Sequence, residues 1–333
     1  MSLPIICTVF LAYVFVGKMM PGLLAHRGYG LMWTVDHLFF TTEGVFGIPL
    51  SVSATYIYMF VLFGTFLEKS GGGQYFIDLA VAGMGRFRGG PAKTAVLASG
   101  LMGMISGSAV ANTVTTGAFT IPLMKKLGYK SHFAGAVEAV ASSGGQFTPP
   151  IMGATAFVIA EFTGIPYVQV MAAAVIPAVL YFLSVGFMVH FEAIKLGLEG
   201  MNTSEKAWKI FLRGIYYLIP IFIILYMLVL GYSPLKAGLY SIYSIIAINV
   251  IQSLFMKGAS IGLKGIVSAL EIGSRNMIEV AIACASAGII IGVVSLTGIG
   301  LRFSALVVRA SGGNLLLALV LTMFTSLILG MGL

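Results

Sequence analysis

Long apolar windows without charged residues recur along this chain, separated by short polar stretches. A helix that spans a bilayer needs about 20 predominantly apolar residues, and most of the windows reach that length. The pattern therefore predicts an all-α membrane protein. The stretch 27–44 and the segment near 258–270 are too polar to cross, and each predicts an interfacial helix. The expected crossings are 3–22, 46–67, 131–162, 166–190, 212–231, 236–256 and 276–296.

The charge-free window 94–124 is too long for one crossing and too short for two crossings with a turn. Lys93 flanks one end, and Lys125 and Lys126 flank the other, so the positive-inside rule places both ends on the cytoplasmic side. We expect a re-entrant hairpin over 91–124, with its tip SGSAVANT inside the bilayer. Backbone that leaves the helix at that depth must line a cavity or be buried in protein.

The crossing 131–162 contains SSGGQFTPPIMG, a segment rich in helix-breaking residues. Pro149 and Pro150 cannot continue a helix, and Gly144 and Gly145 weaken one. The segment predicts a discontinuous helix that is broken near mid-depth. Such a break exposes carbonyl oxygens and the dipole ends of two half-helices, which suit a small cation.

Composition places the chain in the membrane class. Hydrophobic residues make up 59% of the sequence and charged residues 9%, whereas soluble domains carry about 25% charged residues. The net charge of +8 does not indicate a nucleic-acid partner, because the expected topology puts most of the 19 lysines and arginines in cytoplasmic loops. Cys7 and Cys284 lie in apolar runs and are expected to be packing residues.

The end of the chain resembles an earlier part of it, because residues 70–105 align without a gap with 297–332. The expected crossings between the two copies are odd in number, so the second copy must be inverted. We expect a first repeat over 1–231 and an incomplete second repeat over 232–333, which stops at the tip of its own hairpin. The parent protein is therefore expected to continue; the alternative, a natural end here, would leave an unpartnered half-hairpin in lipid.

The hairpin tip carries more polar side chains than helix packing requires. Serine, threonine and asparagine oxygens, with free carbonyls, bind Na⁺ at a lower desolvation cost than charged groups, and half-helix N-termini attract an anionic substrate. The alternative is that these side chains bond back to their own helix or permit close packing. The candidate ion- and substrate-binding residues are Ser106, Gly107, Ser108, Asn112, Thr115, Thr116, Gly144, Gly145, Gln146, Pro149 and Pro150, with Ser108 and Asn112 as Na⁺ ligands.

Glu138 lies about two helical turns before the predicted break. A carboxylate within a membrane segment is a functional candidate. Three interpretations are open: a proton carrier, a cation ligand, and a structural acid bonded to a neighbour. A location near the cytoplasmic interface is also open, because Ser131 lies close by in the sequence.

Two long motifs, in this order, resemble the large membrane subunit of tripartite ATP-independent periplasmic (TRAP) transporters. They are SGSAVANTVTTGAFTIPLMKKLGY at 106–129 and FAGAVEAVASSGGQFTPPIMGATAFVIAEF at 133–162. The glutamate and the GGQ-x-x-PP pattern are similar to the TAXI branch, and so is the stretch 36–71. Two departures from the family are the missing small-subunit helices at the start and the end at GMGL, where family members continue.

The resemblance implies an elevator-type secondary transporter in the cytoplasmic (inner) membrane of a bacterium or archaeon. It implies uptake of an organic anion, such as glutamate or a dicarboxylate, with Na⁺ as the coupling ion. The implied partners are a periplasmic TAXI-type binding protein and a small four-helix membrane subunit, often fused upstream. The family site matches Ser106, Ser108, Asn112, Gly144, Gly145, Gln146, Pro149 and Pro150.

Two other functions stay open. Proton coupling through Glu138 is one, and an ion channel is the other, because broken re-entrant segments also form selectivity filters. The repeat and the lack of charged rings favour a transporter. The sequence holds no Ser–His pair, metal-ligand set or paired carboxylates at matching depth, so we expect neither an enzyme nor a cofactor beyond the coupling ion.

Overall fold

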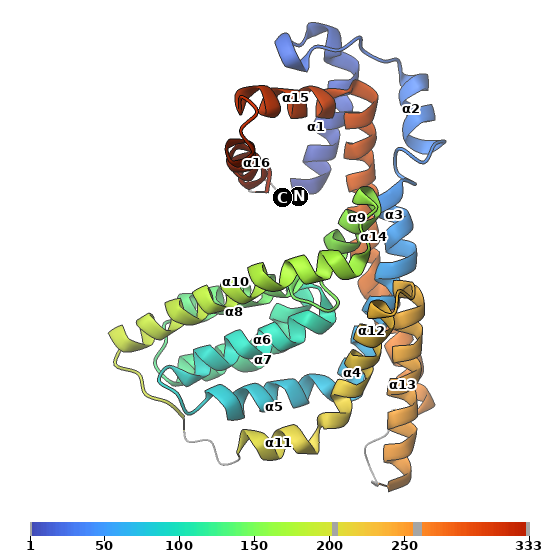
Figure 1. Ribbon diagram of the computed structural model, residues 1–333. Coiled ribbons are helices and arrows are strands. Elements are labelled where there is room, and N and C mark those ends of the chain that lie inside the picture. Colours follow the sequence, from blue (N-terminus) through green and yellow to red (C-terminus); the bar gives the residue numbers. More distant parts are fainter. Residues whose placement is uncertain (1, 202–205, 256–261, 331–333) are drawn as a thin grey trace. The chain divides into compact units, whose positions relative to one another are not determined.

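The computed structural model describes residues 2–201, 206–255 and 262–330, and these residues form helices without any strand (Figure 1). The helices group into two compact units, one formed by Met1–Ala54 with Ile278–Leu333 and the other by Thr55–Met277. Helix α14 (Leu263–Thr297) runs from one unit into the other. The expectation of an all-α chain is confirmed for the described residues.

Within the described residues, four helices are long and apolar enough to cross a membrane: Ile48–Lys69, Tyr167–Lys195, Pro234–Leu254 and Leu263–Thr297. A fifth candidate is the pair Ala207–Arg213 and Ile215–Val229, which is bent by 66°. Helix α1 (Ser2–Val16) is shorter than the expected crossing because a 3₁₀ turn at Gly17–Met19 ends it. The sequence therefore predicted the positions of the long helices more accurately than the length of the first helix.

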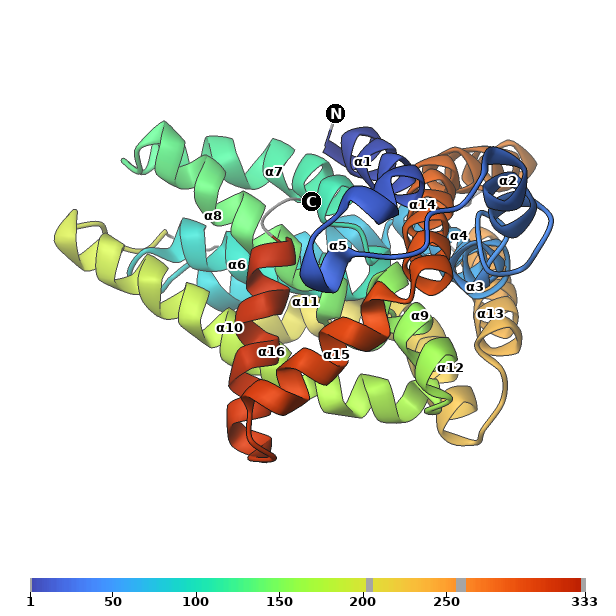
Figure 2. The same ribbon diagram turned by 90° about the horizontal axis from the view of Figure 1, so that it is seen from above.

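The larger unit contains the predicted hairpin and the predicted broken helix. Helices α6, α7, α8 and α10 lie side by side in both views (Figures 1 and 2). The elements of this unit are α4 (Tyr58–Lys69), α5 (Gly72–Met84), α6 (Gly90–Ser106), α7 (Ala109–Lys126), α8 (Ser131–Gly144), α9 (Ala154–Thr163), α10 (Tyr167–Lys195), α11 (Ala207–Arg213), α12 (Ile219–Val229) and α13 (Pro234–Phe255).

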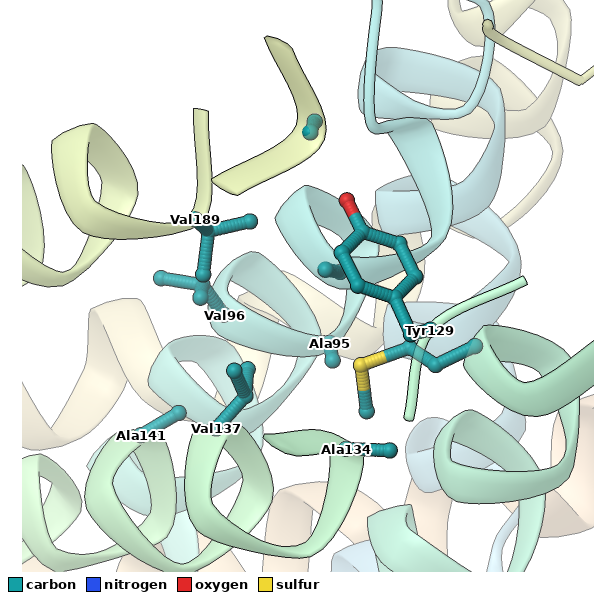
Figure 3. Close-up of a cluster of buried hydrophobic side chains, with 10 residues drawn as sticks. Ala95, Val96, Tyr129, Ala134, Val137, Ala141 and Val189 are labelled. Atoms are coloured by element: carbon teal, nitrogen blue, oxygen red, sulfur yellow. The ribbon is translucent and has the colours of Figure 1, made fainter. Parts of the chain in front are cut away.

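Small side chains allow the hairpin to pack closely against α8 and α10. Figure 3 shows Ala95 of α6 near Ala134 and Val137 of α8, with Val189 of α10 on the other side. Without a hydrophobic driving force between helices in lipid, close backbone approach supplies the van der Waals contact that holds them together. This buried cluster fixes the half of the hairpin away from its tip relative to α8.

The smaller unit holds α1, α2 (Leu31–Phe39), α3 (Ile48–Val52), α15 (Ile299–Ala310) and α16 (Leu315–Gly330). Its core joins Val14, Leu38 and Val293. The range 27–44 contains the shorter helix α2, and its position at the membrane interface stays a prediction. Cys7 and Cys284 are free and buried, as expected for packing residues.

Helix boundaries recur at the positions that the sequence repeat aligns. Gly71 precedes α5 with a φ of 94°, and its counterpart Gly298 precedes α15 with a φ of 70°. The division into units follows packing, not the repeat, so the repeat boundaries and the inversion stay predictions. The expected end of the second hairpin at 331–333, and residues 258–261 of the expected second interfacial segment, lie outside the described residues.

Candidate functional site

The tip of the hairpin is a two-residue turn. Helix α6 ends at Ser106, Gly107 adopts a left-handed φ of 62°, and Ser108 caps α7 by accepting a hydrogen bond from the Ala111 amide at 3.3 Å. This turn is shorter than the expected non-helical tip SGSAVANT. The reason is that α7 already begins at Ala109, and Thr113, the last residue of that stretch, bonds within this helix by donating its hydroxyl to the Ala109 carbonyl at 2.8 Å.

The predicted break lies between α8 and α9: Gly144 is the last residue of α8, and Gly145, Pro149 and Pro150 lie between the two helices. A 3₁₀ turn over Gly145–Phe147 follows α8, and the Pro149–Pro150 peptide bond is cis. The amide of Gly153 then donates to the Gln146 carbonyl at 2.5 Å. The hydroxyl of Tyr167, from α10, donates to the Pro150 carbonyl at 2.9 Å and so supports the broken segment.

The tip and the break touch each other. A Cβ placed on Gly107 would lie 2.1 Å from the Met152 carbonyl oxygen, and one on Gly153 would lie 3.1 Å from the Gly107 carbonyl oxygen. Farther down, a Cβ on Gly103 would lie 2.4 Å from the Gly145 Cα atom. The two motifs that the sequence singled out are therefore in direct contact.

This contact brings four helix ends together. The N-termini of α7, at Ala109, and α9, at Ala154, begin beside the Gly107–Gly153 contact. The C-termini of α6 and α8 converge where Gly103 meets Gly145. Helix N-termini attract anions and C-termini attract cations, so the arrangement offers both kinds of charge a favourable position.

We expect Gly107→Ala to weaken the site strongly. An alanine would be strained at the positive φ and would overlap the Met152 carbonyl, which is backbone and cannot rotate away. The expected result is a destabilisation of about 1–3 kcal/mol, measured by thermal unfolding in detergent. Gly164→Ala is the control for backbone strain alone, because Gly164 has a φ of 67° and a Cβ added there meets nothing within 4 Å. Equal effects of the two substitutions would contradict the tip-to-break contact.

Asn112 is held inside the hairpin, not at its turn. Its side chain is 1% exposed, and its Nδ2 group donates to the Ser99 carbonyl at 2.8 Å. Its Oδ1 atom is buried and has no hydrogen-bond partner among the described residues. A buried amide oxygen without a donor is an oxygen ligand available to a cation.

Glu138 is completely buried, and four hydroxyl groups surround its carboxylate. The Ser99 hydroxyl donates to Oε1 at 2.7 Å and the Ser142 hydroxyl to the same atom at 3.1 Å. The hydroxyls of Thr116 and Thr120 also contact the carboxylate, one on each oxygen. No lysine, arginine or histidine of the described residues forms an ion pair with it.

The structure therefore connects several of the predicted residues and leaves others apart. Ser99 bridges Asn112 and Glu138, and Thr116 belongs to the same cluster. Gln146 is exposed, and Thr115 only bonds within its helix. The sequence did not point to Met152, Ser99, Thr120 and Ser142. Thr120 follows Thr116 by four residues, and Ser142 follows Glu138 by four. This spacing places each pair on one helix face and was the signal that could have identified them.

The described residues contain no group of three or more His, Cys, Asp and Glu side chains that could hold a metal ion. The oxygens that the described residues bring together here belong to hydroxyl, amide and carbonyl groups and to the Glu138 carboxylate. Such a donor set suits a weakly bound hard cation more than a transition metal.

Comparison with known families agrees with this geometry. Residues 1–333 match the family described as the tripartite ATP-independent periplasmic transporter, DctM component. The chain belongs to the DctM family. The resemblance drawn from the two motifs is confirmed at this level, and DctM proteins are transporter permeases, which are not an enzyme class. Together with its long apolar helices, membership makes the chain a multi-pass membrane protein.

Curated relatives of this DctM-family chain carry TRAP transporter names. A 2,3-diketo-L-gulonate TRAP transporter large permease protein from Escherichia coli is 29% identical over 178 residues, which cover 52% of this chain and 41% of the relative. A C4-dicarboxylate TRAP transporter large permease protein from Pseudomonas aeruginosa is 28% identical over 187 residues, covering 54% and 43%. A putative TRAP large permease from Haemophilus influenzae is 28% identical, covering 47% and 36%. The chain spans less than half the length of these relatives.

Proposed function

We propose that this chain is part of a permease that imports a carboxylate-bearing organic anion together with a cation, Na⁺ in the first instance. Two observations carry the proposal. The α7 and α9 N-termini begin beside the Gly107–Gly153 contact. The Asn112 side chain lies next to Gly103, where the C-termini of α6 and α8 converge, and its buried oxygen has no donor among the described residues. The relatives named for diketogulonate and C4-dicarboxylates are consistent with an anionic solute. Glutamate and dicarboxylates are the substrates to test first.

The proposed partners are a periplasmic solute-binding protein and a small four-helix membrane subunit. We place the chain in the TAXI branch because of its GGQ-x-x-PP pattern and of Glu138, and we propose an elevator mechanism in the inner membrane of a bacterium or archaeon. In that mechanism the tip and the break move together as one body. Their direct contact at Gly107 and Gly153 supports that motion.

The test of the cation site uses Asn112→Ala. Loss of an oxygen ligand should raise the Na⁺ concentration for half-maximal uptake about tenfold, as expected for a lost contact to a charged group. The measurement is uptake of radiolabelled solute into proteoliposomes that contain the assembled transporter and its binding protein. Ser108→Ala is less diagnostic, because Ser108 also caps α7.

Asn249→Ala is the matched control. Asn249 is also buried in a helix, its Oδ1 also lacks a partner in the described part of the chain, and its Nδ2 group donates to the Ile245 carbonyl of its own helix. It should change stability without changing the Na⁺ dependence. An unchanged Na⁺ response in Asn112→Ala would refute this residue as a ligand.

Proton coupling is the second candidate, and the surroundings of Glu138 favour it. Thr116 and Thr120 each have one hydroxyl hydrogen but two acceptors within reach, the carboxylate and a carbonyl of their own helix. When the hydroxyls point to the carboxylate, they donate hydrogen bonds to the ion. When they point to the carbonyls, one of their oxygens can accept a hydrogen bond from the O–H group of the neutral acid. The cluster thus accommodates both charge states without backbone movement.

A further inference from the structure

A cavity lies along the outside of the hairpin, between α6 and α10, and reaches the broken segment at Thr148 and Pro149. Its volume is about 840 Å³, and its lining comes mainly from α6 and α10 of the larger unit. That volume is typical of small-molecule sites. It is too small to hold a helix, which is about 10 Å across. Almost all of its lining is apolar, and its most polar members are Lys93, His190 and Thr148.

The lining residues follow one face of each helix. On α6 the cavity contacts Lys93, Leu97, Gly100 and Met104, at the three- and four-residue spacing of a single face. From Lys93 to Met104 the groove is about 16 Å long, given a rise of about 1.5 Å per residue. It is therefore a long apolar channel with a polar group at one end.

That end is cationic. The Lys93 ammonium donates to Nδ1 of His190 at 3.1 Å, which uses only one of its three hydrogens. In the described residues neither side chain forms an ion pair with an acid. Arg86 and Arg88 are exposed on either side of Phe87, which also lines the cavity. A negatively charged group at this end would be favoured.

The cationic end and the apolar channel match the two parts of a membrane lipid. Lys93 stands at the foot of the re-entrant hairpin, which the charge pattern places at the cytoplasmic face, and α6 rises from there toward mid-bilayer. A groove with this course runs along one leaflet from headgroup level inward. We propose that it binds an anionic phospholipid, with the phosphate at Lys93 and His190 and one acyl chain between α6 and α10. This inference does not depend on the transported solute or the coupling ion.

The experiment is native mass spectrometry of the purified chain with phosphatidylglycerol or phosphatidylcholine of identical acyl chains. We expect preferential retention of phosphatidylglycerol. Lys93→Gln should weaken it about fivefold, the effect of one basic residue at an anionic lipid surface, and leave phosphatidylcholine unchanged. Lys93→Arg should keep the preference. Lys125→Gln, an exposed lysine on α7 outside the groove, is the matched control.

The acyl-chain part is tested by Gly186→Phe. Gly186 lines the cavity, and a Cβ there meets nothing within 4 Å, so the ring should fill the channel and displace both lipids. Gly135→Phe, on α8 with equally open surroundings, should retain them. Equal retention of the two lipids, equal behaviour of the Lys93 and Lys125 variants, binding that survives Gly186→Phe, or displacement by inorganic phosphate alone would each overturn the proposal. Thermal unfolding verifies that each variant is folded.

Discussion

Gly103→Ala is expected to destabilise the larger unit and to abolish transport, although alanine is the better helix former. In a helix interior, glycine to alanine should gain up to about 1 kcal/mol from propensity. Here the new Cβ would lie 2.4 Å from the Gly145 Cα atom and 3.2 Å from Nδ2 of Asn112. Because the first neighbour is backbone, α6 and the break must separate. Overpacking of this kind costs about 1–3 kcal/mol, which reverses the sign of the substitution.

The measurement is the apparent melting temperature in detergent, followed by uptake in proteoliposomes. Gly135→Ala is the matched control, since a Cβ there meets nothing within 4 Å. It should leave stability unchanged or raise it slightly. The reciprocal variant Gly145→Ala, with a Cβ 2.5 Å from the Gly103 Cα atom, should behave like Gly103→Ala. A Gly103→Ala protein as stable as the Gly135→Ala protein would contradict the close contact.

The helix–turn–helix of α6 and α7 could be predicted because its signal is local, while its re-entry into the membrane stays a prediction. The charge-free window between Lys93 and Lys125 is too long for one crossing and too short for two. Because backbone in lipid must satisfy its own hydrogen bonds, a hairpin is one of few structures that fit this length. The broken helix was predictable for the same reason, since Pro149 and Pro150 cannot donate to a helix at any depth. Both features follow from rules that act within about 30 residues of sequence.

The extent of the tip was harder to predict. A cluster of serine and threonine looks alike whether it lines a loop or bonds within a helix. In the structure, the hydroxyl of Thr113 donates to the Ala109 carbonyl at 2.8 Å, so this polar group forms its hydrogen bond within its own helix. Which of them face a partner depends on tertiary packing, and of the threonines after the turn only Thr116 and Thr120 point to Glu138.

The Glu138 cluster and the Gly103–Gly145 contact depend on how three helices pack. Ser99, Thr116 and Ser142 lie on α6, α7 and α8, and nothing in their separate sequences specifies that they meet. The spacing of four residues between Glu138 and Ser142 indicates a shared face on one helix but not what lies opposite. Such contacts are set by the shape of the buried small-residue interface, which single-sequence reasoning does not resolve.

The two simplest substitutions of Glu138 should affect the stability of the protein differently. Glu138→Gln keeps the shape and a carbonyl acceptor, and its amide group can donate to a threonine oxygen, so it resembles the neutral acid. It should fold with nearly unchanged stability. Glu138→Leu removes every acceptor. Thr116 and Thr120 can turn to carbonyls of their own helix, but Ser142 loses the partner it has in the structure. A buried hydroxyl left without a partner costs about 1–3 kcal/mol.

The transport measurement then separates the roles of the carboxylate. If the transporter is proton-coupled, Glu138→Gln should lose the dependence of uptake on an imposed pH gradient while it still binds solute. If the carboxylate is structural, Glu138→Gln should transport like the unmodified protein and only Glu138→Leu should fail. Glu161→Gln and Glu161→Leu are the controls, because Glu161 is exposed on α9 and has no such surroundings. Equal stability of Glu138→Leu and Glu138→Gln would show that the four hydroxyls do not need the carboxylate, which would contradict the cluster itself.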